Sequence, residues 1–465
     1  MKHLCKKIIV KFCIRRVYTF FLSCVRGNNS GRNSRCMQIV YIFSLILICG
    51  LVIAAGHMLF NICRQAYRTF KYNMLISSLA EQFPRVTEVD CSVFMSQADL
   101  WNDSVQSLSK LDNLSEEVFD YTDCGKLRAR GFDIPTTEAE TRFPVAFSII
   151  VYTDMQRFTR LFRAVYRSSN VYCIHVDRKS SDEFKESVHN LTSCFDNVFV
   201  PLDTIRVWWG SPSTLEAEMV CLRALWRHQV KWLMLINLTG EEFPLRTNLE
   251  LVHILQIMAG RNDVWLDPCT LDGPDNWTSN ECTFLTENGF AERWQNLSAP
   301  PYNIHPYKGQ IHAVLSRPAV DYILYSPVAR ELYQWISQAF MPDELFFSTI
   351  NSNPHLEVPG SNPNPRMRKR SIARLKLWRD RHNRVWPRCS MYQRFVCLFT
   401  ARELPLLTSS RQLVANKFKA DYRPVGYSCL EQWYFERVSA ELGTGQVQLD
   451  LDEYRRIFPT MITPN

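Results

Sequence analysis

From Val145 onward, short apolar segments alternate with amphipathic ones, and this alternation constrains the fold more than any other feature of the chain. The apolar, β-branched segments predict strands over residues 145–153, 171–177, 197–201 and 231–238. The segments between them predict helices over residues 155–166, 214–228 and 248–260, and Ser180 with Glu183 predicts a capping box for one further helix. Strand and helix alternation of this kind is typical of an α/β fold with a mainly parallel central sheet and helices on both faces.

Ligands of such a sheet bind beyond the carboxyl ends of its strands, so polar residues at those points are candidate site residues. They are residues 152–154, 177–179 and 239–242. No glycine-rich dinucleotide loop, P-loop or serine nucleophile elbow follows any of these strands, which excludes the corresponding enzyme classes. Residues 261–308, rich in Asn, Asp, Pro and Trp, are expected to be irregular and to face a substrate.

The amino-terminal part of the chain predicts a membrane anchor. Residues 1–37 hold nine Lys and Arg and no acidic residue, and residues 38–60 form an apolar run without a charge. At about 1.5 Å per residue, this run spans a bilayer core of about 30 Å. Because basic flanks stay in the cytosol, we expect a single-pass type II protein with a luminal stem over residues 61–90 and a luminal domain over residues 91–465.

The charge of the rest of the chain argues against nucleic acid as a partner. The formal net charge of +8 comes mostly from the basic tail, since the remainder holds 45 basic and 46 acidic residues.

Cysteines and sequons agree with a luminal domain. Beyond the apolar run and its edges the chain has ten cysteines without metal-binding spacing, which favours disulfides in an oxidising compartment. Six sequons occur, one of them at Asn237, and we expect glycans at the other five: Asn102, Asn113, Asn190, Asn276 and Asn296.

A series of motifs resembles one known family. The segments "YCIHVDRKS", "SCFDNVFV", "INLTGEEFPLRTNLELV", "PDELFFSTI", "EVPGS", "RFVCLF" and "ANKF" occur in the order and at the spacing of the core-2/I-branching β-1,6-N-acetylglucosaminyltransferases. The resemblance covers about residues 91–435. It implies a GT-A-type glycosyltransferase fold and a type II protein of the Golgi membrane.

The resemblance also implies the chemistry of an inverting transferase. Such an enzyme needs a carboxylate that takes the proton of the acceptor hydroxyl, and positive charge that stabilises the departing diphosphate. Glu344 matches the family's catalytic base, and Arg394 and Lys417 match its two diphosphate-binding cations. Asp177 matches a uridine contact and Trp209 an aromatic residue against the nucleotide. We expect Glu344 in the first turn of a helix that Phe346 and Phe347 anchor, where the dipole would favour its ionised form; Asp343 would only cap this helix.

No metal or other cofactor is expected. Most GT-A enzymes hold the diphosphate through a metal on an Asp-x-Asp motif, and the only such triplet here, Asp450 to Asp452, lies in the tail, where a solvated acidic segment is expected. The family instead uses the two cations matched by Arg394 and Lys417.

Four disulfides follow from the resemblance by position: Cys91 with Cys429, Cys124 with Cys194, Cys173 with Cys221, and Cys389 with Cys397. Cys269 and Cys282 lie outside the family set, and we expect them to pair with each other.

Acceptor recognition departs from the family. Its acceptor-binding carboxylate falls at Trp265, its two acceptor-binding basic residues fall near Gly273 and Asn276, and its tyrosine falls at Asp380. Only the aromatic Trp378 is kept. The sequence therefore predicts transfer of GlcNAc from UDP-GlcNAc to a glycan acceptor, in protein O-glycan branching, without fixing the acceptor.

Three alternatives stay open. The donor could instead be UDP-glucose or UDP-xylose. The chain could be a lectin-like membrane protein without activity, since a fold does not determine a function. A homodimer is also open.

Overall fold

The computed structural model describes residues 117–266, 298–339, 341–361, 371–379, 391–419 and 424–459, residues scattered through 56–96, residue 389, and the backbone of 282–286 and 289–293. The chain divides into two compact units, Met1–Ser78 and Leu79–Asn465. Most of the apolar run over residues 38–60 lies outside the described residues, and none of the helices that are described is long and apolar enough to cross a membrane. The following concerns the second unit.

A six-stranded sheet forms the centre of this unit, in the order β3-β2-β1-β4-β9-β6. Its strands are β1 (Val145–Val151), β2 (Val171–Val176), β3 (Val198–Phe199), β4 (Met234–Thr239), β6 (Asp263–Leu266) and β9 (Gly309–Ser316). The first four pair in parallel, and β9 runs antiparallel to both β4 and β6. The expectation of a mainly parallel sheet is confirmed.

The expectation that residues 261–308 are irregular is wrong in two places. Asp263–Leu266 is the edge strand β6, and β7 (Cys282–Thr286) pairs with β8 (Gly289–Arg293) as a hairpin. The sequence signal of β6 is weak because the strand is short and begins with a buried carboxylate. Asp263 Oδ2 accepts hydrogen bonds of 2.8 Å from the backbone N–H groups of Ile372 and Ala373, which attaches a distant segment to this edge.

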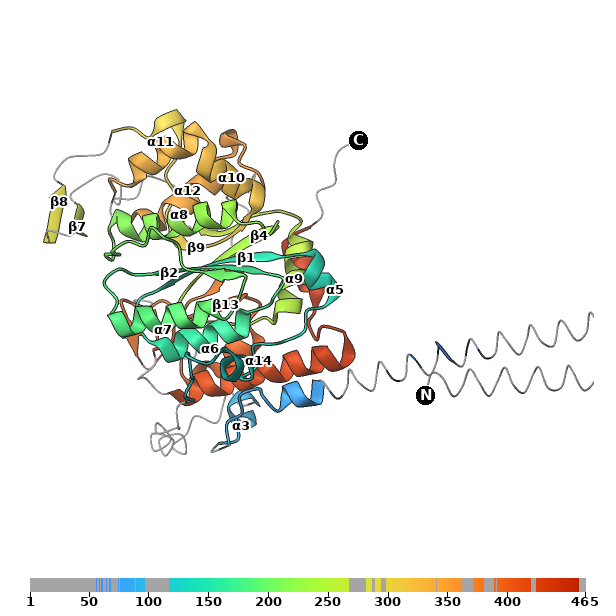
Figure 1. Ribbon diagram of the computed structural model, residues 1–465. Coiled ribbons are helices and arrows are strands. Elements are labelled where there is room, and N and C mark those ends of the chain that lie inside the picture. The colour runs from blue at the N-terminus through green and yellow to red at the C-terminus, as the bar shows by residue number, and fades with distance from the viewer. Residues whose placement is uncertain are drawn as a thin grey trace, which may run out of the picture. The chain divides into compact units, whose positions relative to one another are not determined.

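Helices cover both faces of the sheet, as Figure 1 shows. One face packs against α8 (Pro212–Arg227), α10 (Arg317–Tyr325), α11 (Pro327–Ile336) and α12 (Phe346–Ser352), and the other against α6 (Met155–Val165), α7 (Asp182–Ser193) and α9 (Asn248–Met258), with α14 (Pro424–Thr444) beyond α6. Side chains of a strand alternate between its faces, so Ala146 of β1 joins the core under α8, while Phe147 and Ile149 join the core under α6.

The predicted capping box at Ser180 is wrong by one residue. Ser181 is the N-cap of α7, and its hydroxyl accepts a hydrogen bond from Phe184 N–H. Ser180 is buried, and its hydroxyl donates instead to the carbonyl of Tyr152 at 2.6 Å. The hydroxyl that could cap the helix is therefore used to join the chain after β2 to the chain after β1.

Four disulfides connect the unit: Cys91 with Cys429, Cys124 with Cys194, Cys173 with Cys221, and Cys389 with Cys397. These pairings coincide with those that the resemblance implies. Cys269 lies outside the described residues, as does the side chain of Cys282, so their pairing stays a prediction.

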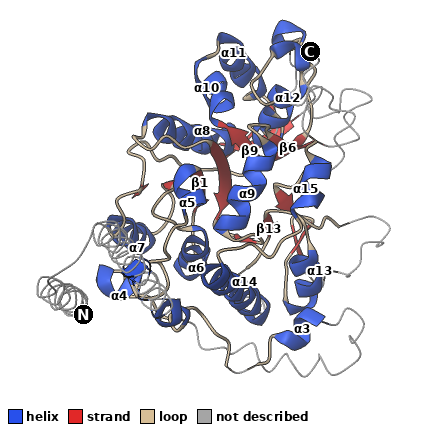
Figure 2. Cartoon of the chain, turned by 90° about the vertical axis from the view of Figure 1, so that its right-hand side faces the viewer, coloured by secondary structure: helices blue, strands red, loops and turns tan. Residues whose placement is uncertain are grey.

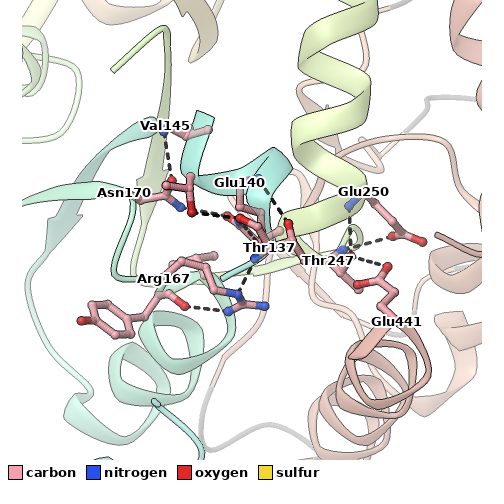
Figure 3. Close-up of polar contacts among 12 residues, drawn as sticks. Thr137, Glu140, Val145, Arg167, Asn170, Thr247, Glu250 and Glu441 are labelled. Atoms are coloured by element: carbon pink, nitrogen blue, oxygen red, sulfur yellow. Dashed lines mark hydrogen bonds and ion pairs between the residues drawn. The ribbon is translucent and has the colours of Figure 1, made fainter. Parts of the chain in front are cut away.

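Buried polar contacts close the amino ends of the central strands (Figure 3). Asn170, just before β2, accepts a hydrogen bond of 3.0 Å from Val145 N–H and donates one of 2.8 Å to Asn248 on α9. The hydroxyl of Thr247 donates to Glu441 on α14 at 2.7 Å, and burial raises the pKa of Glu441 to about 8. These contacts join β1, β2, α9 and α14 at the amino ends of the strands. The polar residues that follow the strands lie at the opposite, carboxyl ends.

A buried ion pair joins α14 to α6, which lie side by side in Figures 1 and 2. Arg163 is 0% exposed and lies 2.7 Å from a carboxylate oxygen of Glu431, which is 1% exposed. Arg160 donates to the other oxygen of Glu431 at 2.6 Å. Removing one partner of such a pair leaves the other charge buried and uncompensated, which costs about 3–5 kcal/mol.

We therefore expect Glu431→Gln to lower the free energy of unfolding by about 3 kcal/mol, because Arg160 loses its counter-charge and Arg163 keeps only that of Glu117, 2.8 Å away. Chemical unfolding of the purified chain with its disulfides intact measures this. Glu436→Gln is the matched control, since Glu436 is exposed on the same helix. Equal effects of the two substitutions would show that the ion pair does not hold α14 in place.

Candidate active site

A second, three-stranded sheet brings residues from three distant segments to one edge. It consists of β10 (Arg374–Leu375), β13 (Val414–Asn416) and β5 (Glu242–Pro244), in the order β10-β13-β5. β10 and β13 are parallel, and β5 is antiparallel to β13. One edge of this sheet therefore contains the carboxyl ends of β10 and β13 and the amino end of β5. Strand β5 begins three residues after β4 ends.

The carboxylate of Glu242 lies at this edge and is fully buried. One oxygen accepts hydrogen bonds from Arg374 at 3.0 Å and Asn416 at 2.9 Å, and the other accepts one from Thr239 N–H at 2.9 Å. His312 Nε2 lies 2.7 Å from the first oxygen. Burial acts to raise the pKa of Glu242, but the Arg374 guanidinium and His312 hold it below its usual range, so the carboxylate is ionised.

Lys417 follows β13 directly, and its ammonium lies 3.1 Å from Glu241. Only 13% of the lysine side chain is exposed, against 45% of the glutamate. The backbone carbonyl of Lys417 accepts a hydrogen bond from Phe399, and Phe418 N–H donates to the carbonyl of Glu241. The predicted diphosphate-binding lysine is therefore held beside the chain that leaves β4.

Arg394 lies at the tip of the hairpin formed by β11 (Tyr392–Gln393) and β12 (Val396–Cys397). Arg394 and Phe395 both have positive φ, of 50° and 66°, as a tight two-residue turn between strands requires. The Arg394 guanidinium lies over the ring of Trp209, with its carbon 4.6 Å from the ring centroid. Two predicted donor-binding residues, 185 positions apart in the numbering of the chain, are thus in contact.

Asp177 is buried directly after β2, at the carboxyl end of the sheet. Its carboxylate accepts hydrogen bonds from the backbone N–H of Lys179 at 2.8 Å and from the Lys179 ammonium at 2.6 Å. That ammonium also donates to the carbonyl of Val207 at 2.6 Å and lies 4.7 Å from the ring centroids of Tyr152 and Trp208. Lys179 belongs to the polar segment after the second strand, and no sequence motif assigns it a role.

The loop that carries Trp209 is fastened to β2. Ile205 N–H donates to Nε2 of the buried His175 at 3.1 Å, and burial lowers the pKa of His175 to about 4, so this ring is neutral and can accept. Val207 N–H donates to Asp177 at 3.3 Å. Trp209 itself is half exposed, and its role against the nucleotide stays a prediction.

Glu344 is not in the first turn of an α-helix, which corrects the expectation. Pro342–Glu344 is a separate 3₁₀ turn, η4, which α12 follows after Leu345. The chain turns at Met341, which has a φ of 52°, and Met341 N–H donates to the carbonyl of Gly210 at 3.1 Å. Gly210 directly follows Trp209, so this bond joins the segment that carries the candidate base to the loop that carries the candidate nucleotide-binding ring. Phe346 and Phe347 are buried and anchor the segment as expected.

Asp343 does not cap a helix, which is a second correction. Its carboxylate accepts a hydrogen bond of 2.9 Å from the hydroxyl of Thr214, in the first turn of α8. Burial raises the pKa of Asp343. The side chain therefore fastens η4 to α8, a contact between distant segments that the local sequence could not reveal.

Lys376 lies at the same edge and was not among the predicted site residues. It follows β10, as Lys417 follows β13, and its ammonium lies 5.5 Å from the ring centroid of Trp378. Burial lowers the pKa of Lys376 to about 8, and the charges of Glu344 and Lys417 both act on it. Arg374, Lys376 and Trp378 are two residues apart and so share one face of an extended chain, a pattern that could have identified Lys376.

Trp378, the predicted acceptor-binding residue, is 40% exposed. It pairs with Val396 in an isolated bridge, which places the chain after β10 alongside the Arg394 hairpin. Trp265 lies half-buried on β6. Gly273, Asn276 and Asp380 lie outside the described residues, so the rest of the acceptor region stays a prediction.

The remaining predicted residues lie away from this edge. Asp450 is the exposed N-cap of α15 (Leu451–Ile457), and Asp452 is exposed beside Arg455. Asn190 is half-buried on α7, while Asn237 is buried in β4 with both amide atoms in hydrogen bonds, so it cannot carry a glycan. The predicted glycosylation sites Asn102, Asn113, Asn276 and Asn296 lie outside the described residues.

Comparison with known proteins places this architecture in a family. The family "Branch: Core-2/I-Branching enzyme" matches residues 145–405. Rattus norvegicus beta-1,3-galactosyl-O-glycosyl-glycoprotein beta-1,6-N-acetylglucosaminyltransferase 3 is 30% identical over 340 residues, which cover 70% of this chain and 76% of the relative. Homo sapiens N-acetyllactosaminide beta-1,6-N-acetylglucosaminyl-transferase is 32% identical, with 70% and 81% covered. A Bos taurus beta-1,3-galactosyl-O-glycosyl-glycoprotein beta-1,6-N-acetylglucosaminyltransferase is 30% identical, with 82% and 93% covered.

The matched residues include the six-stranded sheet and the strands β5 and β10 of the second sheet. Strand β13, with Asn416, and Lys417 after it lie beyond residue 405. The chain belongs to the core-2/I-branching enzyme family.

Proposed function

We propose that the chain is an inverting β-1,6-N-acetylglucosaminyltransferase that moves GlcNAc from UDP-GlcNAc to a glycan acceptor in protein O-glycan branching, without a metal ion. The relatives carry this activity in their names. One observation of the site supports it most: the Arg394 guanidinium lies over the ring of Trp209, and the backbone of Gly210, the next residue, accepts a hydrogen bond from Met341 N–H at the start of the turn that ends in Glu344. The segments that carry the candidate base, the nucleotide-binding ring and a diphosphate-binding cation are therefore in contact.

In the proposed reaction, the acceptor hydroxyl attacks the anomeric carbon of the donor while the Glu344 carboxylate takes the hydroxyl proton. The new bond joins the acceptor oxygen to this carbon. The bond between the carbon and the phosphate oxygen breaks, and UDP leaves with the electron pair. Arg394 and Lys417 neutralise the charge that develops on the diphosphate, as charge-assisted contacts worth roughly 1.5–3 kcal/mol each. Lys417 would exchange Glu241 for the diphosphate when the donor binds.

The other predicted residues would position the two substrates. Asp177 and the half-exposed ring of Trp209 would hold the nucleoside, with Arg394 already lying over that ring. The exposed face of Trp378 offers an apolar surface to a sugar acceptor. Because the bridge of Trp378 to Val396 continues into the Arg394 hairpin, the acceptor surface and the donor surface are parts of one connected segment.

The cellular setting belongs to the same proposal. The basic tail, the apolar run over residues 38–60 and the disulfides within the second compact unit support a single-pass type II protein of the Golgi membrane with a luminal catalytic domain. The stem and the domain boundaries at residues 60 and 90 are proposed with it.

We expect Glu344→Gln to reduce kcat by about 10²-fold to 10⁴-fold or more, because a positioned base supplies a factor of this size. The affinity for UDP should change by no more than a few fold, because the amide keeps the shape of the side chain. Transfer from a panel of UDP-GlcNAc, UDP-glucose and UDP-xylose to glycan acceptors measures kcat, and calorimetric titration measures UDP affinity.

Glu331→Gln is the control for this substitution, because Glu331 is exposed on α11. Substantial turnover by a folded Glu344→Gln variant would remove Glu344 from the mechanism. A wild-type chain that binds glycans but turns over none of the donors would instead favour the lectin-like alternative.

We expect wild-type transfer to persist in EDTA. In metal-dependent transferases a metal ion neutralises the charge of the leaving diphosphate, and here the side chains of Arg394 and Lys417 would do so. Lys417→Ala should lower kcat by about 10-fold to 10²-fold, and added Mn²⁺ should not restore it. Donor turnover with and without EDTA, for wild type, Arg394→Ala and Lys417→Ala, tests this.

Lys231→Ala is the control, because it removes a lysine that is exposed near the amino end of β4 and away from the site. If wild-type activity disappears in EDTA and returns with Mn²⁺, the assignment of both cations is wrong and the carboxylates near Asp177 become candidates for a metal site.

A further inference from the structure

The ammonium of Lys179 joins three segments at the carboxyl ends of the central strands. It donates a hydrogen bond of 2.6 Å to Oδ2 of Asp177, directly after β2, and one of 2.6 Å to the carbonyl of Val207, in the loop before α8. It also lies 4.7 Å from the ring centroid of Tyr152, which follows β1, and 4.7 Å from that of Trp208. One side chain therefore connects the ends of two strands to the loop that leads to Trp209.

These contacts use the whole ammonium of Lys179. An ammonium has three N–H donors, and two of them are given to Asp177 and Val207. The rings of Tyr152 and Trp208 favour positive charge beside them. Only 21% of the lysine side chain is exposed, and only 5% of the Asp177 side chain. The ammonium is therefore committed to contacts within the protein, and its effect on a ligand must be exerted through the groups that it holds.

Val207 is held at both of its backbone polar groups by the pair of Asp177 and Lys179. Its carbonyl accepts the hydrogen bond from the Lys179 ammonium, and its N–H donates to Asp177 at 3.3 Å. A buried carboxylate needs partners for its oxygens, so the ion pair and the backbone of Val207 satisfy one another. The chain two residues before Trp209 is thereby fixed to the end of β2, and this attachment depends on the charge and the donors of Lys179.

Trp209 lies between two such attachments. Val207 precedes it by two residues, and the carbonyl of Gly210, directly after it, accepts a hydrogen bond of 3.1 Å from Met341 N–H. The first attachment leads to β2, and the second leads to the turn that carries the proposed base. The ring of Trp209 is half exposed, and the Arg394 guanidinium lies 4.6 Å from its centroid. The two backbone attachments therefore help to determine where this ring meets a ligand.

We propose that Lys179 is a positioning residue of the nucleotide site, whose ammonium fastens the loop of Trp209 to the end of β2 and so places the ring for the uridine of the donor. The proposal rests on the proposed function, in which Asp177 and Trp209 hold the nucleoside. It also limits what Asp177 can offer. Of the roughly four hydrogen bonds that a carboxylate can accept, three are taken by the Lys179 ammonium, Lys179 N–H and Val207 N–H, which leaves one position at Oδ1 for a further donor.

The test is the affinity for UDP, measured by calorimetric titration of the full-length chain in detergent. Lys179→Met removes the ammonium and keeps an unbranched side chain, so the loop of Trp209 loses its attachment to β2. The dissociation constant of UDP should rise about tenfold, the size of effect that loss of one charge-assisted contact gives. The KM for UDP-GlcNAc should rise by a similar factor, while kcat at saturating donor stays within a few fold, because the groups that act on the reacting atoms are unchanged.

Lys179→Arg should keep UDP affinity within a few fold, because the guanidinium retains the charge and the donors. Lys185→Met is the matched control, since Lys185 forms an exposed ion pair with Asp182 at 3.2 Å on α7, and it should leave UDP affinity unchanged. If near-UV circular dichroism shows that Lys179→Met does not fold, Lys179→Gln replaces it, with the same loss of UDP affinity expected. Unchanged UDP affinity in the folded neutral variant overturns the proposal.

A double-mutant cycle distinguishes positioning of Trp209 from a general structural role. Lys179→Met should raise the dissociation constant of UDP about tenfold in the wild type but no more than about threefold in Trp209→Ala, which has no ring to position. Equal factors in the two backgrounds, or a fall in kcat as large as the rise in donor KM, overturn the proposal.

The binding cycle also separates this inference from the proposed function, because it needs no acceptor and no transfer. If the wild type binds UDP but transfers no sugar from any donor, the proposed function fails, and the cycle still decides whether Lys179 acts through Trp209. A wild-type chain that does not bind UDP overturns both.

Discussion

The buried carboxylate of Glu242 is the contact on which the geometry of the site depends. It lies where β4 ends and β5 begins, and it holds Arg374 of β10 and Asn416 of β13 with hydrogen bonds of 3.0 and 2.9 Å. An ionised carboxylate without access to water needs partners for both oxygens, and it finds them only if the three strands meet at this edge. Since Lys376 and Lys417 come directly after two of these strands, their positions follow from how Glu242 is satisfied rather than from their own contacts.

Much of the fold could be predicted because its signals are local. The apolar runs of β1, β2 and β4 and the amphipathic period of α6 are visible within a dozen residues, and the structure has these elements within three residues of the predicted bounds. The alternation of strand and helix then fixes a mainly parallel sheet. β6 was missed because an edge strand of four residues has no such period. Its first residue, Asp263, is a buried carboxylate that accepts hydrogen bonds from the distant segment 371–373.

The candidate site divides in the same way between local and distant determinants. Asp177 could be located from its strand alone, while Glu344, Arg394 and Lys417 depended on motif resemblance, since a carboxylate before two phenylalanines or an arginine in a hairpin has many structural explanations. Lys376 was not identified by either route. Its position follows from the pairing of β10 with β13 and of β13 with β5, which joins segments far apart in the sequence.

Asp343 and Glu344 show how two adjacent carboxyl groups can be given different tasks. Asp343 points back to Thr214, and its burial raises its pKa, so its role is to hold the 3₁₀ turn against α8. Glu344 is the last residue of the same turn and is the proposed base, which must be ionised to take up a proton. The turn also determines where Glu344 lies. Because Met341 N–H is bonded to the carbonyl of Gly210, the position of Glu344 depends on the loop that carries Trp209 rather than on a helix axis.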